Sequence, residues 1–193
     1  MSSPDQGSSG STFVRAARAS DAAGLARIQI ESWRRDLAGL VSGDVLDQLT
    51  SDEAAAEWES RWGEAITSPP TSRHRVFVSV TPSGPVGFAS AGPATDPDKW
   101  PATDGQLHEL RVLPSQSDEG HASRLLHAVA DTLAEDGFRT LSTWILEADS
   151  GYRDFLAAAG LEPDGARGEL DMGKPLVVMR YVTGIGEFGG QPT

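Results

Sequence analysis

Residues 107–146 read LHELRVLPSQSDEGHASRLLHAVADTLAEDGFRTLSTWIL, and their pattern indicates a strand, a polar loop, a helix and a second strand. The strands are predicted at Leu107–Leu113 and Phe138–Leu146. Between them, from Gly120 onward, apolar residues recur every three or four positions, which is typical of an amphipathic helix. Gly137 is suited to end this helix, whose apolar stripe comprises Ala122, Leu125, Leu126, Val129, Ala130 and Leu133. A helix of this length between two strands predicts a parallel pair joined by a right-handed crossover.

The predicted strand at Leu107–Leu113 does not alternate regularly. Leu110 and Val112 share one face, whereas Leu107 falls on the other. Either both faces of this strand are buried, or a bulge shifts its phase. The sequence alone leaves both alternatives open.

The loop after this strand has the features of an anion site. Ligands of such sheets bind beyond the carboxyl ends of the strands, here between Leu113 and Ala122. A tight turn into a helix exposes free N–H groups and the positive end of the helix dipole, which suit a pyrophosphate. Gly120 and Ala122 leave little side chain in the way. Alone, Gly-x-Ala before a helix is typical of an ordinary capping turn, but its place between this strand and this helix favours the anion site.

The remaining chain adds helices before the sheet and an antiparallel hairpin within it. The predicted elements are a strand at Phe13–Ala17, a helix capped by Ser20, a break at Leu37–Asp44, a helix capped by Ser51, strands at Arg75–Val80 and Val86–Ala91 around the turn Thr81–Pro85, a short helix capped by Asp149 and a strand at Val177–Val182. We therefore expect an α/β (α+β) fold with a mixed, mostly antiparallel central sheet flanked by helices.

Composition indicates one globular domain, which we expect at residues 13–183 between flexible tails at 1–12 and 184–193. The chain has 193 residues, 38% of them hydrophobic, and no cysteine, so disulfides and cysteine-ligated metals are excluded. We expect no metal site. The absence of a secretory signal and of a membrane-spanning run predicts a cytoplasmic protein without a membrane partner. The net charge of −12 argues against nucleic acid, because phosphate binding needs surplus Lys and Arg.

Several motifs, in this order and spacing, resemble the GNAT acyltransferases. Leu107–Pro114 is similar to the family's fourth strand, and Ser117–Ala122 stands where the family carries its pyrophosphate loop, usually Gln/Arg-x-x-Gly-x-Gly/Ala. Leu146–Asp149, followed by Phe155 and Gly160-Leu161, is similar to the next strand and helix. The resemblance covers residues 13–182 and implies the GNAT acyl-CoA acyltransferase fold, with acetyl-CoA as co-substrate.

The resemblance also implies where coenzyme A binds. Val112 is the implied position for the thioester and for a backbone N–H that stabilises the oxyanion, and Asp149 stands where the family has an Asn. We expect Asp149 to act primarily as a helix cap, with contact to the cofactor as its secondary role. The full implied set of cofactor-binding residues is Val112, Leu113, Ser117, Asp118, Glu119, Gly120, His121, Ala122, Ser123 and Asp149.

The loop departs from the family pattern in ways that weaken anion binding. Ser117 replaces a long polar side chain, and Asp118 and Glu119 stand where Gly and a basic residue are common. Each exposed carboxylate beside a pyrophosphate costs on the order of 1 kcal/mol and is screened by salt. The alternative is an acidic loop that only solvates the start of the helix.

The candidate catalytic residues are Glu109 and Tyr152. Glu109 is our first choice for a general base and His108 the second; as neighbours on a strand they are expected to face opposite sides, so at most one faces the cleft. Pairing of Glu109 with Arg111 is the alternative role. The family's Tyr acid falls on Leu156 here, and Tyr152, one turn earlier, either replaces it or only packs.

The acceptor is expected to be the amine of a small molecule or peptide, contacted by Glu31, Trp33 and Arg34 in the first helix. The leading hypothesis is an N-acetyltransferase that uses direct attack on acetyl-CoA. The alternative is a degenerate, non-catalytic GNAT-fold module that binds acyl-CoA or another ligand as a sensor. A Rossmann-type nucleotide binder is disfavoured, because no Gly-x-Gly-x-x-Gly follows a strand. Such folds often form homodimers, and the sequence indicates no interface.

Overall fold

The computed structural model describes residues 12–186. The predicted tails at 1–12 and 184–193 therefore lie outside the described residues, apart from Thr12 and residues 184–186. Gly184 belongs to the last strand and Ile185 is buried. The folded part thus extends past the predicted boundary at residue 183.

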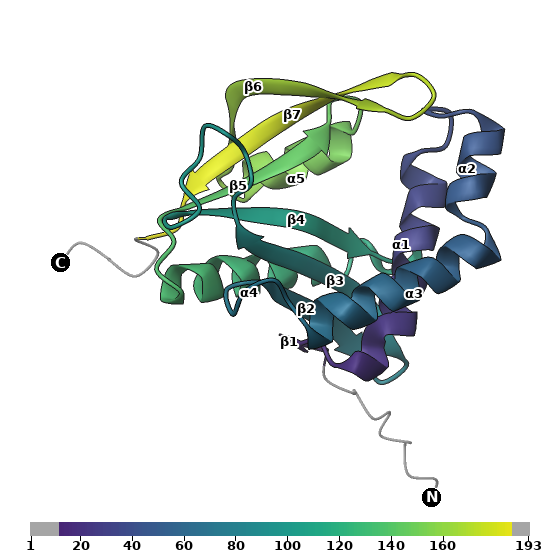
Figure 1. Cartoon of the computed structure of the whole chain (residues 1–193), viewed down its shortest axis with the longest axis horizontal. Coiled ribbons are helices and arrows are strands. Elements are labelled where there is room, and N and C mark those ends of the chain that lie inside the picture. Colours follow the sequence, from purple (N-terminus) through teal and green to yellow (C-terminus); the bar gives the residue numbers. More distant parts are fainter. Residues whose placement is uncertain (1–11, 187–193) are drawn as a thin grey trace, which may run out of the picture.

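The chain forms seven strands and five α-helices within the described residues (Figure 1). The strands are β1 (Phe13–Ala16), β2 (Arg75–Thr81), β3 (Gly84–Pro93), β4 (Asp104–Val112), β5 (Thr140–Leu146), β6 (Glu162–Asp171) and β7 (Pro175–Gly184). The helices are α1 (Ala22–Asp36), α2 (Gly43–Leu49), α3 (Asp52–Thr67), α4 (His121–Glu135) and α5 (Ser150–Ala158).

All seven strands form one sheet in the order β1-β2-β3-β4-β5-β7-β6. Neighbouring strands are antiparallel except β4 and β5, which are parallel and joined through α4. The prediction of a mixed, mostly antiparallel sheet flanked by helices is confirmed, as is the parallel pair around the long helix.

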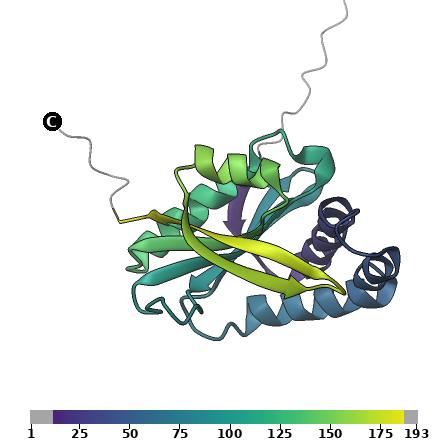
Figure 2. The ribbon, with the colours of Figure 1, turned by 90° about the horizontal axis from the view of Figure 1, so that it is seen from above.

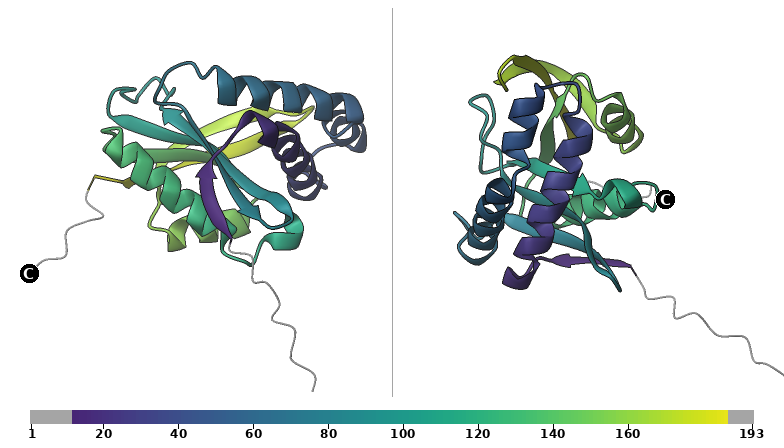
Figure 3. Two further views of the ribbon diagram at one scale, coloured as in Figure 1. Left: turned by 90° about the horizontal axis from the view of Figure 1, so that it is seen from below. Right: turned by 90° about the vertical axis from the view of Figure 1, so that its right-hand side faces the viewer.

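The two faces of the sheet carry separate cores (Figure 2, Figure 3). On one face, α4 packs its predicted stripe against alternate residues such as Phe77 and Ala89. On the other face, α1 and α3 pack against Val78 and Phe88, the neighbours of those residues in the strands. No helix within residues 12–186 is long and apolar enough to cross a membrane.

Side-chain caps fix two of the helix starts as predicted. The Ser51 hydroxyl accepts a hydrogen bond from the N–H of Ala54, and the Asp149 carboxylate accepts one from the N–H of Tyr152 at 2.9 Å. Ser20 is not a cap, which corrects the prediction. It lies in a 3-10 turn, where the neighbouring Asp21 carboxylate accepts from the N–H of Arg18 at 2.7 Å.

Two elements escaped prediction because neither buries an apolar stripe. Helix α2 has no buried residue and begins inside the stretch predicted as a break, with Ser42 as its cap. Strand β6 is an edge strand that is exposed along most of its length. In Figure 1 the turn after β6 lies beside α2.

Strands β4 and β5 pair over only four residue pairs and then diverge. The register runs from Asp104 with Thr140 to Leu107 with Thr143, and beyond these residues the two strands share no pairing. The second half of β4 therefore has no strand partner on its β5 side. This opening lies at the carboxyl ends of both strands, where ligand sites occur in such sheets.

Arg180 on β7 holds the hairpin β6–β7 against the rest of the molecule. Its guanidinium, almost fully buried, donates to the carboxylates of Asp96, Asp98 and Asp164 at 3.1, 2.6 and 2.8 Å. Asp96 and Asp98 belong to the loop between β3 and β4, and Asp164 belongs to β6. The hydrogen bond from Arg180 is the main reason that the pKa of Asp98 falls to about 2.

We predict that Arg180→Met lowers the free energy of unfolding by about 3 kcal/mol, because it leaves partly buried carboxylates without their cation. Arg167→Met is the matched control, since Arg167 pairs with Glu147 in an exposed position on β6. It should cost less than about 1 kcal/mol. Urea denaturation followed by circular dichroism measures both, and equal losses would contradict the clamping role of Arg180.

Candidate functional site

A bulge in β4 sets the direction of the side chains at the opening. Ser90 pairs with Glu109 and Ala91 with Leu107, so His108 is the extra residue. Leu107 and Leu110 consequently pack in the same core, which resolves the alternatives in favour of the bulge. His108 and Glu109 both line the pocket beside the opening. The prediction that at most one of them faces the cleft is therefore wrong, because it assumed regular alternation.

Two pockets flank the opening between β4 and β5. The first, here called the hairpin pocket, has a volume of about 550 Å³ and lies between α1, β4, β5 and the β6–β7 hairpin. The second, the loop pocket, has a volume of about 480 Å³ and lies between β4, α5 and the loop before α4. Four residues line both pockets, namely Asp36, Arg111, Asp149 and Tyr152. A ligand in one pocket can therefore meet a ligand in the other at these four residues, which we call the junction of the two pockets.

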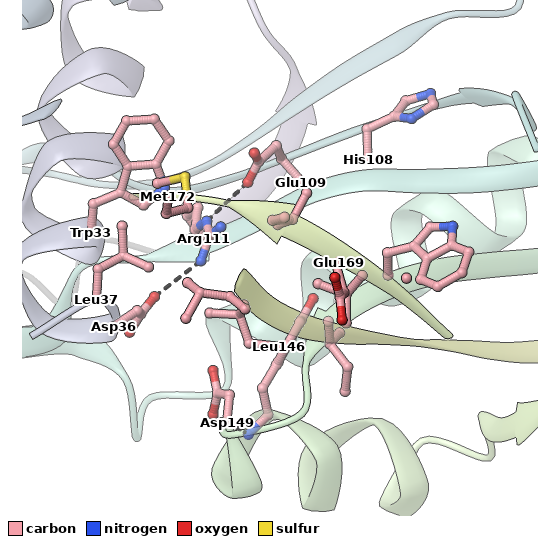
Figure 4. A pocket seen from close by; sticks show the side chains of 17 residues that line it. Trp33, Asp36, Leu37, His108, Glu109, Arg111, Leu146, Asp149, Glu169 and Met172 are labelled. Carbon is pink, nitrogen blue, oxygen red and sulfur yellow. Dashed lines mark hydrogen bonds and ion pairs between the residues drawn. The ribbon is translucent and has the colours of Figure 1, made fainter. Parts of the chain in front are cut away.

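Arg111 stands at this junction between two carboxylates (Figure 4). Its guanidinium donates to Glu109 at 2.9 Å and to Asp36 of α1 at 3.0 Å. Burial lowers the pKa of Arg111, but the two carboxylates raise it by more, so the side chain stays charged. The ion pair between Glu109 and Arg111, predicted as the alternative role of Glu109, is present. Glu109 nevertheless lines the hairpin pocket as well.

Tyr152 also reaches both pockets from the first turn of α5. Its ring stacks on Phe155 with 5.8 Å between centroids and an angle of 7° between the planes. Burial raises the pKa of the Tyr152 phenol, an effect that Arg111 opposes and Glu109 and Asp149 reinforce. The phenol therefore remains protonated at neutral pH. Tyr152 therefore both packs on Phe155 and lines the site. The sequence had left these two roles as alternatives.

The backbone of β4 offers a free donor at the junction. The N–H of Leu113 donates to the carbonyl of Val86 on β3 at 2.8 Å. Successive N–H groups along a strand point to opposite edges of that strand. The N–H of Val112 therefore points to the other edge of β4, where the pairing with β5 has already ended. The bulge itself lies at His108. The donor at Val112 is thus freed by the divergence of the strands, not by the bulge.

The start of α4 has the geometry of an anion site. Gly120 adopts a left-handed conformation with φ of 73°, and no side chain caps the helix. The N–H groups of the first turn of α4 therefore lack a side-chain partner. Ser117, Asp118 and Ala122 line the loop pocket directly in front of this turn.

One guanidinium lies close to the acidic loop. Arg124, in the first turn of α4, donates to the carbonyl of Glu119 at 2.7 Å. Arg35 and Arg111 line the loop pocket but are already paired, Arg35 with Asp36 and Arg111 with Asp36 and Glu109. Arg124 therefore offsets part of the negative charge that we expected to weaken anion binding.

The predicted cofactor residues divide into three groups. Val112, Ser117, Asp118, Ala122 and Asp149 line the loop pocket. Glu119, Gly120 and Ser123 lie at the turn into α4 without lining the pocket. The side chains of Leu113 and His121 are buried, so these two residues offer only backbone atoms. His121 shares a hydrogen bond of 2.9 Å with the hydroxyl of Ser79.

The predicted acceptor residues are separated by the helical period of α1. Trp33 lines the hairpin pocket and packs edge-on against Trp58 at 5.1 Å. Glu31 and Arg34 line a different hollow, between α1 and the start of α3. Glu31 pairs with Arg27 there, and Arg34 donates to the carbonyl of Thr50 at 2.7 Å. Trp33 is the member of this set that the structure brings to the opening.

His108 lines the hairpin pocket (Figure 4). Its ring stacks on that of His74, with 6.4 Å between the centroids. Loss of solvation lowers the pKa of His108, and the neighbouring His74 lowers it further while Asp96 opposes the shift. The ring is therefore neutral at neutral pH and able to accept a proton.

Sequence reasoning missed Asp36, Arg35 and Glu169 as lining residues. Asp36 and Arg35 follow Trp33 by three and two residues, so the period of α1 was the signal for Asp36. Glu169 had no signal, because β6 itself was not predicted. Within residues 12–186, no group of three or more potential ligand side chains lies close enough to hold a metal ion.

Comparisons of the sequence agree with this geometry. The model of the acetyltransferase (GNAT) family matches residues 43–160. An uncharacterized N-acetyltransferase of Bacillus subtilis (strain 168), YuaI, is 30% identical over 135 residues, which cover 69% of this chain and 71% of that protein.

Solved structures share the fold at lower identity. The PaiA N-acetyltransferase of Thermoplasma acidophilum in complex with coenzyme A superposes with a TM-score of 0.70 at 18% identity, covering 88% of this chain and 98% of that one. YncA of Salmonella typhimurium, with its cofactor acetyl-CoA, gives a TM-score of 0.61 at 17% identity, covering 93% and 96%.

We predict that Tyr152 ionises with a midpoint above the ordinary value of about 10. The chain has two tyrosines, so the ultraviolet titration of the wild type minus that of Tyr152→Phe isolates this group. Because the folded pKa is raised, its stabilising contribution is full below pH 10 and is lost as pH rises through the raised pKa. Circular dichroism at each pH confirms that the chain is folded. A midpoint at or below 10 in folded protein would contradict the burial of this phenol.

Proposed function

Because the chain belongs to the GNAT family of acetyltransferases, we propose that it transfers the acetyl group of acetyl-CoA to the amine of a small molecule. The observation that carries this proposal is the meeting of two pockets at the unpaired edge of β4. The loop pocket takes acetyl-CoA, and the hairpin pocket takes the amine. The family membership favours an enzyme over the non-catalytic module.

The loop pocket suits coenzyme A for two physical reasons. The uncapped first turn of α4 directs N–H groups and the positive end of the helix dipole at a pyrophosphate. The free edge of β4 offers backbone groups to an extended chain such as the pantetheine arm. Arg124 supplies positive charge beside Glu119. We infer that the acidic loop lowers affinity for coenzyme A without abolishing it.

Acetyl transfer at the junction follows from the groups gathered there. The amine nitrogen attacks the thioester carbonyl carbon, so a C–N bond forms and negative charge develops on the carbonyl oxygen. The N–H of Val112 is the donor for that oxygen. The C–S bond then breaks, and the sulfur takes the proton of the Tyr152 phenol and leaves as a thiol. The phenol is protonated at neutral pH, while its raised pKa limits how readily it gives up the proton.

The attacking amine must also lose a proton. Glu109 lines the hairpin pocket beside the junction, and its carboxylate is the proposed acceptor of that proton. Neutral His108, on the same wall, is the second candidate. Arg111 holds Glu109 in place through their 2.9 Å contact and so positions the base.

We predict that the purified chain releases coenzyme A thiol from acetyl-CoA when a primary amine such as butylamine is added. The chain has no cysteine, so a thiol-reactive dye detects only the product. Glu109→Gln should lower kcat about 100-fold or more, the usual contribution of a general base. Glu31→Gln, the same chemical change in the other hollow, should retain wild-type activity.

Two outcomes would contradict this account. If acetyl-CoA neither binds in calorimetry nor releases thiol with any amine, the chain is not an acetyltransferase. If thiol is released but Glu109→Gln retains more than a third of the wild-type kcat, the proton passes to another group. His108→Gln then tests the second candidate directly.

A further inference from the structure

A buried imidazole stands at the end of the acidic loop, and the proposed reaction does not use it. His121 is the first residue of α4, and its side chain is fully buried. Its Nδ1 shares a hydrogen bond of 2.9 Å with the hydroxyl of Ser79 on β2. Because a hydroxyl both donates and accepts, this bond persists whether the ring carries one proton or two. The ring is thus fixed against the sheet at the helix end that faces the proposed pyrophosphate site.

The other ring nitrogen of His121, Nε2, has no hydrogen-bond partner among the described residues. It is buried, and it lies 3.5 Å from a carboxylate oxygen of the exposed Glu119 without bonding to it. A buried polar atom without a partner is unfavourable. A proton on Nε2 together with a small movement of Glu119 would turn this approach into a charge-assisted hydrogen bond. The geometry therefore provides a place for a second proton on the ring.

The other charges close to His121 belong to the loop and to the first turn of α4. Asp118 lines the loop pocket, and Arg124 donates to the carbonyl of Glu119 at 2.7 Å. Arg15 of β1 lies on the opposite face of the sheet, where it pairs with Asp21. Within residues 12–186, the strands packed against α4 present uncharged side chains to its core face, among them Val14 of β1, Phe77 of β2, Ala89 of β3 and Leu110 of β4. The charge on the ring therefore depends on the loop and on what binds there.

Opposing effects act on a second proton at this ring. Burial and the positive end of the α4 dipole oppose a charge on His121, whereas the carboxylate of Glu119 favours it. A pyrophosphate at the first turn of α4 adds negative charge at the same helix end and favours the protonated ring further. By linkage, the protonated ring must favour the pyrophosphate to the same extent. Its positive charge also offsets the carboxylate of Glu119, which alone repels the anion.

We propose that His121 takes up a proton on Nε2 when acetyl-CoA binds, and that the charged ring then compensates Glu119 beside the pyrophosphate. This inference rests on the proposed function and adds to it how the acidic loop accommodates the cofactor. The proton comes from solvent, and the acetyl transfer itself is unchanged. Because the ring is buried, it acts on the cofactor through its charge and through Glu119, as a positioning residue.

Calorimetry in two buffers measures this proton uptake. The binding enthalpy is determined at pH 7 in PIPES and in imidazole, whose ionisation enthalpies differ, and the difference gives the number of protons taken up. Dephospho-coenzyme A is the ligand, because it keeps the pyrophosphate but lacks the 3′-phosphate, which itself titrates near neutral pH. The wild type should take up about half a proton for each ligand bound, since histidine titrates in this range of pH.

His121→Asn should lower the uptake to about a tenth of a proton or less, because an amide does not titrate. His127→Asn is the matched control, since it makes the same change at an exposed histidine of the same helix, and it should keep the wild-type uptake. The affinity must follow the same sign. Because a proton is bound together with the ligand, the wild-type Kd should rise about fivefold from pH 6 to pH 8, whereas that of His121→Asn should change less than about twofold.

A second measurement leaves His121 in place. The chain has four histidines, and in protein with 13C-labelled histidine their ring signals in nuclear magnetic resonance report protonation. Substituting the other three histidines one at a time assigns the signal of His121. Dephospho-coenzyme A added at constant pH should move this signal toward the position of the protonated ring.

The inference is overturned if dephospho-coenzyme A binds the wild type without proton uptake, or if the ring signal of His121 does not move on binding. It is also overturned if His121→Asn keeps the uptake, or if His127→Asn loses it. In each of these cases the nucleotide binds, so the proposed function stands. If neither acetyl-CoA nor dephospho-coenzyme A binds, the proposed function is overturned, and this inference with it.

Discussion

The divergence of β4 and β5 after four residue pairs is the constraint on which the site depends. A continuous parallel pair would satisfy the backbone of β4 on both sides and leave no room between the two pockets. Because the strands part, the N–H of Val112 keeps a free direction, and the loop into α4 and the start of α5 lie at the same opening. Backbone geometry thus creates the proposed acyl-transfer position, to which the side chains add charge and shape.

The side chains at the opening come from four distant parts of the chain. Asp36 arrives from α1, Arg111 and Glu109 from β4, Tyr152 from α5 and Glu169 from β6. Their electrostatics are coupled, since the carboxylates that keep Arg111 charged also help to keep the Tyr152 phenol protonated. The Arg180 cluster fixes the β6–β7 hairpin, which forms one wall of the hairpin pocket, so the stability of the fold and the shape of this pocket depend on the same strands.

The sequence predicted most of the fold because its signals are local. The stripe of α4, the caps Ser51 and Asp149 and the hairpin turn each depend on residues close together in the chain. It missed β6, whose exposed residues carry no pattern, and with it Glu169. It also misjudged His108 and Glu109, because a bulge depends on the register with β3, which no local pattern encodes. The place of the Ser117–Ala122 motif between a strand and a helix indicated where the loop pocket lies. The ion pair of Arg111 with Asp36 joins residues far apart in the sequence, so only the structure could reveal it.

Hydrogen–deuterium exchange with and without saturating acetyl-CoA tests most directly whether the unpaired edge of β4 is the acyl-CoA site. We predict that acetyl-CoA slows exchange in the segments 108–113 and 120–124, because each contains N–H groups without a partner in the free chain, that of Val112 among them. Residues 76–80 of β2, paired with strands on both sides, should exchange at the same rate in both states. Unchanged exchange at residues 108–113 in the presence of acetyl-CoA would contradict the account.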